Sequence, residues 1–365
     1  MHLQQIKFLY GSAGLHLYAS NVIGKGGNSA AFSFRSFILQ KRRSLVVTSL
    51  FSVAALSLGV AIPTTAMADT YPSKPIKFVV PWAPGGATDQ IARILAQPLS
   101  QSLGQSIVVE NKGGAGGNIG TAAFVKEKAD GYTILLTTSS THAAGPHLYK
   151  SQGFDVHKDF TPVIFVASVP NVMVVPANSP WNSIKDIVNA AKKEPGKYTY
   201  GSAGIGGSQH LAGANFKTIT GVDIRHVPYK GSGPAAVDLI AGHIDMMVDT
   251  GSLGSVRAGR LKPLAVASKK RLEVLPNVPT FAEAGFPMLA SAWYGVMLPA
   301  NAPADVVARL NKELNKALQN AEVRKRLHEL GAEIGGGTAD DFGKFAASEI
   351  KRYEGIVRDS GAPKE

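Results

Sequence analysis

Three glycine-rich segments, at residues 83–89, 201–210 and 229–235, are where this chain could do chemistry. Each follows a short apolar run and leads into a run with helical periodicity. Glycine permits positive φ angles and close backbone approach, so several N–H groups can converge in such a loop. The N-terminus of the following helix adds about half a positive charge. These segments therefore predict anion binding, and a carboxylate is the natural ligand.

The first segment belongs to the stretch PWAPGGATDQ at residues 81–90, directly after the apolar run 76–80. Its prolines stiffen the approach, Gly85 and Gly86 expose backbone N–H groups, and Asp89 caps the following helix. An ordinary strand-to-helix turn would explain one such segment. Three of them, with the first two in different predicted lobes, favour ligand capture.

Enzymatic motifs are weaker in this sequence. The glycines at 112–118 do not fit G-x-G-x-x-G, and no phosphate-binding G-x-x-x-x-G-K-[ST] occurs. The run YGSAG at 200–204 approaches an esterase G-x-S-x-G elbow but has tyrosine at the first glycine position. An exported hydrolase using Ser202 or Ser208 with His210 remains an alternative. Ser208 and His210 are two residues apart at a helix start, where their side chains do not face each other.

Metal and cofactor signals are also weak, so we expect neither. His142 and His147 are five residues apart rather than four, and the chain has no cysteine. Asp245 and Asp249 lie ~13 Å apart if both belong to one strand, too far to act together. Asp249, at the loop end, is the better candidate for a pocket residue that contacts a ligand hydroxyl or amine.

Charge does not predict nucleic-acid binding. The 365-residue chain has a net charge of +12, but residues 1–68 contain six basic and no acidic residues. The remainder carries 32 basic and 26 acidic residues, without a basic stripe interleaved with aromatic residues.

Residues 1–68 are predicted to be a targeting segment. The basic run KRR at 41–43 precedes the uncharged apolar stretch 44–62, and AMA at 66–68 fits a signal-peptidase site. This pattern predicts export to the periplasm with cleavage near Ala68, and a retained membrane anchor is the alternative. Residues 1–38 fit no signal, and a start codon assigned too far upstream would explain them.

The mature chain alternates short apolar runs with helix-period runs, which predicts an α/β fold with largely parallel sheets. Pro98 is expected to bend or shorten the first helix. The predicted strands are 76–80, 106–110, 133–138, 171–175, 198–201, 223–227, 244–248 and 263–267, and the predicted helices are 89–102, 119–129, 183–193, 208–220, 233–241, 303–319, 321–330 and 338–359.

Extended apolar stretches around 169–171 and at 291–299 are predicted to cross between two lobes. One lobe would comprise residues 69–170 plus 293–365, and the other residues 171–292. Two crossings make a hinge, and a cleft between α/β lobes is a favoured ligand site.

Six segments together resemble the Bug family, the solute receptors of tripartite tricarboxylate transporters. They occur in family order and span residues 70–365. The resemblance implies a two-lobed periplasmic-binding-protein (Venus flytrap, type II) architecture and no catalysis. These segments are PWAPGGATDQIAR, VVENKGGAGGNIG, ADGYTILLTTSS, YGSAGIGGSQHLAG, VPYKGSGPA and VLPNVPTFAEAGFP.

The resemblance also implies a set of ligand-binding positions, in which loop backbone, hydroxyl groups and ordered water hold the carboxylate without an arginine clamp. Trp82 would cover one side of the ligand, although core packing explains it equally well. The implied positions are Trp82, Pro84, Gly85, Gly86, Asp89, Thr138, Ser139, Ser140, Ser202, Gly204, Gly207, Ser208, His210, Tyr229, Lys230, Gly231 and Asp249.

The implied partners are a small carboxylated solute and the membrane permease subunits of a tripartite transporter. A di- or tricarboxylate, an aromatic acid and an amino acid all remain open as the solute. The protein is expected to act as a monomer, and a ligand sensor for a signalling partner is a further alternative to transport.

Overall fold

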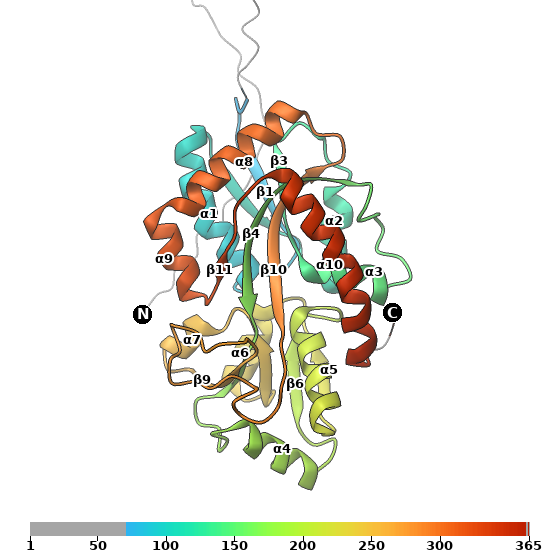
Figure 1. Cartoon of the computed structure of the whole chain (residues 1–365), viewed down its shortest axis with the longest axis vertical. Helices are drawn as coiled ribbons and strands as arrows, with labels where there is room; N and C mark the ends of the chain where they lie inside the picture. The colour runs from blue at the N-terminus through green and yellow to red at the C-terminus, as the bar shows by residue number, and fades with distance from the viewer. Residues whose placement is uncertain (1–70, 363, 365) are drawn as a thin grey trace, which may run out of the picture. The chain divides into compact units, whose positions relative to one another are not determined.

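The structure is a computed structural model that describes residues 71–362 and residue 364, which fall in one compact unit. The predicted targeting segment lies outside the described residues. Two mixed sheets form the framework (Figure 1). The first has the order β11-β4-β10-β3-β1-β2 and the second β7-β6-β8-β5-β9. The strands are β1 Ile76–Val80, β2 Ile107–Asn111, β3 Thr133–Thr138, β4 Phe160–Pro170, β5 Val172–Pro176, β6 Thr199–Ser202, β7 Arg225–Pro228, β8 Met246–Asp249, β9 Leu261–Val266, β10 Ser291–Pro299 and β11 Glu333–Ile334.

Helices cover both faces of each sheet. On the first sheet, α1, α8 and α9 share one apolar core, whereas α2, α3 and α10 lie on the opposite face (Figure 1). On the second sheet, α4 and α5 pack on one face and α6 and α7 on the other. The helices are α1 Ala87–Leu103, α2 Asn118–Phe124, α3 Gly145–Leu148, α4 Ile184–Lys193, α5 Ser208–Thr220, α6 Ser232–Ala241, α7 Leu253–Arg257, α8 Ala304–Gln319, α9 Ala321–Glu329 and α10 Ala339–Ser360, with a 3₁₀ turn η1 at Ala115–Gly117 and a π-helical turn η2 at Ser140–Ala144.

The α/β expectation is confirmed, but the prediction of largely parallel sheets is wrong. In the first sheet β1 pairs in parallel with β2 and β3, while β10 runs antiparallel to both β3 and β4. In the second sheet β5 runs antiparallel to β8 and β9. The strands that run against the others are β10 and β11 in the first sheet and β5 in the second, and β5 and β10 are next to the crossings.

The chain crosses between the sheets at the two positions that the apolar stretches predicted. It leaves the first sheet at the end of β4, begins β5 two residues later, and returns as β10. Asn171, between β4 and β5, is fully buried, and its N–H donates to Ala290 O at 2.9 Å, next to the returning strand. Its side-chain Nδ2 donates to Val248 O at 2.8 Å. Asn171 therefore ties the two crossings to each other and to β8.

Several element boundaries differ from expectation. Helix α1 continues through Pro98 to Leu103, so the predicted shortening is wrong; buried Leu99 and Leu103 hold the last turns against the core. Helix α2 was expected to extend to residue 129, but it ends at Phe124. Val125 is its C-cap residue and donates its N–H to Thr121 O at 3.1 Å. Most of strand β4 was not predicted, because Pro162 and Pro170 within it are poor strand signals.

Candidate functional site

Three long helices begin with glycine where the two sheets face each other. The N-cap residues of α1, α5 and α6 are Gly86, Gly207 and Gly231, which have no side chain to cap the first turn. In α5 the Ser208 N–H donates to Ser140 Oγ at 3.1 Å. Helices α4, α9 and α10 begin elsewhere and have side-chain caps. The free N–H groups of an uncapped first turn, with the helix dipole, favour a bound anion.

The first turns of all three helices line one cavity, with about 330 Å³ of space not filled by atoms. Both sheets contribute, because β3 and β10 come from the first and β6 and β8 lead to it from the second. None of the lining side chains is charged. The lining residues are Trp82, Gly86, Ala87, Thr88, Thr138, Ser140, Ala203, Ser208, Gln209, Ser232, Thr250, Ala292 and Tyr294.

Five of the implied ligand-binding residues line this cavity, and the other twelve lie around it. Gln209 and Ser232 line the cavity but were not among the implied ligand-binding residues, although both belong to the glycine-rich segments. Their side chains reach the cavity because of where they lie in the first turns of α5 and α6. Tyr294 pairs with Thr138 in the β10–β3 register, a long-range relation without a local signal. The five implied residues that line the cavity are Trp82, Gly86, Thr138, Ser140 and Ser208.

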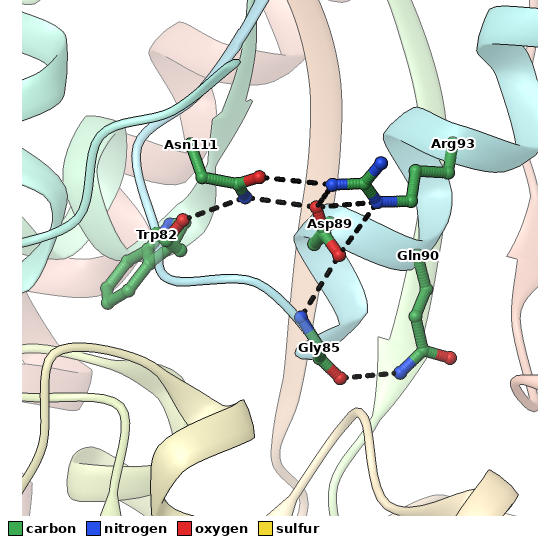
Figure 2. A network of polar contacts seen from close by, with 6 residues as sticks. All are labelled: Trp82, Gly85, Asp89, Gln90, Arg93 and Asn111. Atoms are coloured by element: carbon green, nitrogen blue, oxygen red, sulfur yellow. Dashed lines mark hydrogen bonds and ion pairs between the residues drawn. The ribbon is translucent and has the colours of Figure 1, made fainter. Parts of the chain in front are cut away.

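Asp89 organises the first-lobe loop (Figure 2). Its Oδ2 accepts a hydrogen bond from the Gly85 N–H at 3.0 Å, where φ is +91°. Arg93 Nε lies 3.1 Å from both carboxylate oxygens, and Asn111 Nδ2 donates to Asp89 Oδ1 and to Trp82 O, each at 3.0 Å. Burial alone would raise the pKa of Asp89, but the hydrogen bonds from Arg93, Gly85 and Asn111 outweigh it and hold the pKa below its usual value. Asp89 thus fixes the loop and does not line the cavity.

Replacing Asp89 with asparagine is expected to lower the free energy of unfolding by about 2 kcal/mol, because charge-assisted hydrogen bonds from Arg93 and Gly85 are lost. Urea denaturation at pH 7 measures this change. Asp223→Asn is the matched control, since the Asp223 side chain is exposed and, among the described residues, forms its ion pair with Lys217, at 3.5 Å; a surface pair contributes roughly 0–1 kcal/mol. Equal losses in the two variants would contradict the role assigned to Asp89.

Asp249 organises the second-lobe loops in a similar way. Its side chain is buried and accepts hydrogen bonds from Gln209 Nε2 at 3.0 Å, Ser232 Oγ at 2.7 Å and Gly251 N at 3.0 Å, as well as from Ser252 Oγ. Two of these donors line the cavity. Asp249 therefore orients neighbouring polar groups beneath the cavity wall rather than lining the wall itself.

The proposed hydrolase residues do not form a serine–histidine pair at the cavity. Ser202 Oγ lies 2.6 Å from Nε2 of His226, not His210, and Ser202 is fully buried outside the cavity lining. His210 Nδ1 accepts the Gly206 N–H at 3.2 Å. Ser208 lines the cavity, and its backbone N–H donates to Ser140 Oγ at 3.1 Å. Among the described residues, no serine of the cavity wall has an imidazole partner.

The remaining implied residues surround the contact between the lobes. Ala83 N donates to Lys230 O at 3.3 Å, and Lys230 itself is exposed. A Cβ on Gly231 would lie 2.8 Å from that of Ala83, so glycine permits this approach. Tyr229 instead donates to Asp238 Oδ2 at 2.7 Å, away from the cavity lining. The other implied residues that do not line the cavity are Pro84, Gly85, Ser139, Gly204 and Gly207.

A second hollow lies between α8 and α10 on the first sheet. Its empty volume is about 1250 Å³, and small residues such as Ala308 and Gly343 form much of its wall. None of the implied ligand-binding residues lines it, which leaves the cavity between the sheets as the candidate site.

Comparison with known proteins identifies the class. A sequence model of the "Tripartite tricarboxylate transporter family receptor" matches residues 91–362. The chain belongs to this receptor family. It is 40% identical over 324 residues to BugT of Bordetella pertussis, covering 88% of this chain and 98% of BugT. The resemblance to the Bug family is therefore confirmed.

Two solved structures show the same fold. The periplasmic binding protein BugD is 35% identical, with a TM-score of 0.77 over 81% of this chain and 100% of BugD. R. palustris Rpa4515 with adipate is 38% identical, with a TM-score of 0.78 over 81% of this chain and 100% of that chain. The receptor thus has the two-lobed periplasmic-binding-protein fold. In residues 71–362, no helix combines the length and apolarity needed to span a membrane.

Proposed function

We propose that this receptor captures a small carboxylate, of the dicarboxylate class, in the cavity between its lobes and delivers it to the permease of a tripartite transporter. The observation that carries the proposal is the convergence of three uncapped helix N-termini on a cavity without charged lining residues. The lobes would comprise residues 69–170 plus 293–365 and residues 171–292. The adipate in the related Rpa4515 structure supports the same ligand class.

The expected affinity follows from the kind of contacts available. Hydrogen bonds from backbone N–H groups to a carboxylate contribute roughly 1.5–3 kcal/mol each. Two or three of them, with burial of the carbon chain, give micromolar or tighter binding after the cost of association. Helix α1 would donate from the first lobe, and α5 and α6 from the second, so binding would favour the closed arrangement of the lobes.

Calorimetric titration with a panel of acids tests this proposal. We expect at least one of the dicarboxylates succinate, malate and adipate to bind with micromolar or tighter affinity and to be recovered unchanged, and citrate, glutamate and benzoate to bind more weakly. The matching diamide of the tightest acid should bind at least 100-fold more weakly, because it cannot place a negative charge at the helix N-termini. Equal binding of acid and diamide, or turnover of the acid, would contradict the proposal.

Trp82 supplies a further test of the ligand position. It lines the cavity, is only 6% exposed, and its indole Nε1 has no hydrogen-bond partner among the described residues. A buried donor without a partner is costly, and a ligand oxygen could satisfy it. Trp82→Phe is expected to weaken binding about tenfold in calorimetric titration, with the melting temperature of the ligand-free protein unchanged. Unchanged affinity would assign Trp82 to core packing alone.

We propose that the receptor is exported, that it is cleaved near Ala68, and that it acts as a monomer. The pattern at residues 41–68 supports this. Intact-mass measurement of protein from the periplasmic fraction is expected to give a chain beginning near Asp69. A periplasmic chain that retains residues 44–62 would instead indicate an anchor.

A further inference from the structure

Two histidine rings are stacked beneath the second glycine-rich loop. His210 on α5 and His226 on β7 have ring centroids 4.2 Å apart and an interplanar angle of 19°. Tyr200 on β6 stacks on His226 at 4.9 Å and 24°. The three rings come from three separate elements, so the stack joins α5 to two neighbouring strands of the second sheet. None of them lines the cavity.

Each imidazole fixes one backbone N–H of the loop. Nδ1 of His210 accepts from Gly206 N at 3.2 Å. Nε2 of His226 bonds Ser202 Oγ at 2.6 Å, and the same Oγ accepts from Gly204 N at 3.0 Å. The N–H groups of Gly204 and Gly206 are therefore both held from the side of the histidines. Burial lowers the pKa of His210 to about 4 and that of His226 to about 3, so both rings are neutral near pH 7.

These bonds hold two glycines at positive φ angles, which residues with a side chain rarely adopt. Gly204 has φ +129° and Gly206 has φ +76°. The Gly207 N–H closes the turn on Gly204 O at 3.1 Å. Ala203 at the start of this turn and Ser208 directly after it both line the cavity. Consequently, any shift of the turn moves two parts of the cavity wall at once.

We propose that His226, acting through Ser202 and together with His210, is a positioning residue that sets the shape of the loop and so raises the affinity of the cavity for its carboxylate. The predicted effect of His226 on affinity rests on the proposed function. Its predicted effect on the shape of the loop does not. His226 does not line the cavity, and its influence passes through Gly204 and Gly206. No local sequence pattern indicated this role, because residue 226 lies 24 positions from Ser202.

Paired variants separate the hydrogen bond from the ring stack. His226→Phe keeps a flat ring against Tyr200 but cannot bond Ser202. His226→Gln restores a polar partner without the ring. We expect His226→Phe to weaken binding of adipate or malate, whichever the wild type binds more tightly, at least tenfold by calorimetry, and His226→Gln to recover at least half of that loss on a logarithmic scale. Equal affinity of His226→Phe and wild type, or no recovery with His226→Gln, would overturn the proposal.

Ser202→Ala guards against a His226 variant that fails to fold, because it removes only the Oγ linking His226 to Gly204. We expect a similar tenfold loss of affinity and at least tenfold faster hydrogen exchange of the Gly204 amide. His243→Phe is the control, since His243 is exposed and its partner, Asp238, does not belong to the second glycine-rich loop. Unchanged exchange at Gly204 in Ser202→Ala would overturn the positioning role. If the wild type binds no acid but exchange at Gly204 accelerates, the positioning role stands and only the proposed function fails.

Discussion

Replacing Gly233 with alanine is expected to weaken carboxylate binding at least 100-fold without destabilising the ligand-free protein. Gly233 is the second residue of α6, and a Cβ built there would lie 2.1 Å from Pro84 O and 3.3 Å from the Gly85 Cα. The lobes could then no longer approach as they do here, which would cost at least about 2.8 kcal/mol of binding at 1.4 kcal/mol per tenfold. In a helix, however, alanine is about 0.5–1 kcal/mol more favourable than glycine. Affinity and stability should therefore change in opposite directions.

Gly254→Ala is the matched control for this prediction. Gly254 is also the second residue of a helix in the same lobe, α7, but a Cβ there would meet nothing within 4 Å. Calorimetric titration and thermal denaturation of both variants, with small-angle scattering to follow compaction by ligand, separate the two effects. Wild-type affinity in Gly233→Ala would show that the contact with Pro84 is not needed for binding.

Acidification from pH 7 to pH 5 is expected to destabilise the protein through its buried histidines, His142, His210 and His226, and His142 can be tested by itself. This side chain is buried, with Phe160 5.1 Å and Trp293 6.2 Å from its ring. Burial, with a smaller contribution from His157, lowers its pKa to about 3. The unfolded value is about 6.5, so below pH 6.5 the unfolded chain binds a proton that the folded protein does not. Stability therefore falls with pH, by up to about 1.4 kcal/mol per unit from this one residue.

His142→Phe isolates this contribution, because phenylalanine suits the aromatic surroundings and does not titrate. Urea denaturation at pH 7, 6 and 5 should give a slope against pH that is flatter by up to about 1.4 kcal/mol per unit than in the wild type. His243→Gln, which removes a histidine at an exposed position, is the control substitution. Identical slopes in His142→Phe and wild type would contradict the assignment.

Much of the framework follows from local sequence patterns. Apart from β4 and β11, apolar runs located the strands of both sheets to within a few residues. The extended stretches around 169–171 and 291–299 marked the crossings, because a crossing strand remains apolar on both faces. The glycine-rich segments located the starts of α1, α5 and α6, because each segment lies between an apolar run and a run with helical periodicity.

The cavity wall could be predicted only in part. Tyr294 reaches it through the pairing of β10 with β3, where it lies opposite Thr138 and donates to Thr250 Oγ1 at 3.2 Å. Such a relation depends on register across the sheet rather than on neighbours in sequence. Asp89 and Asp249 were expected at the ligand, but both carboxylates satisfy protein donors behind the wall. Their residue type predicts that they make polar contacts. Whether such a carboxylate contacts a ligand or supports a loop depends on the direction of its side chain, which the sequence does not show.

A crystal structure of the receptor with adipate tests the central claim most directly. We expect one carboxylate to accept hydrogen bonds from backbone N–H groups in the first turn of α1 and from the first turn of α5 or α6, with no lysine or arginine contact. Adipate bound in the hollow between α8 and α10, or held in the cavity by a cationic side chain, would contradict the account.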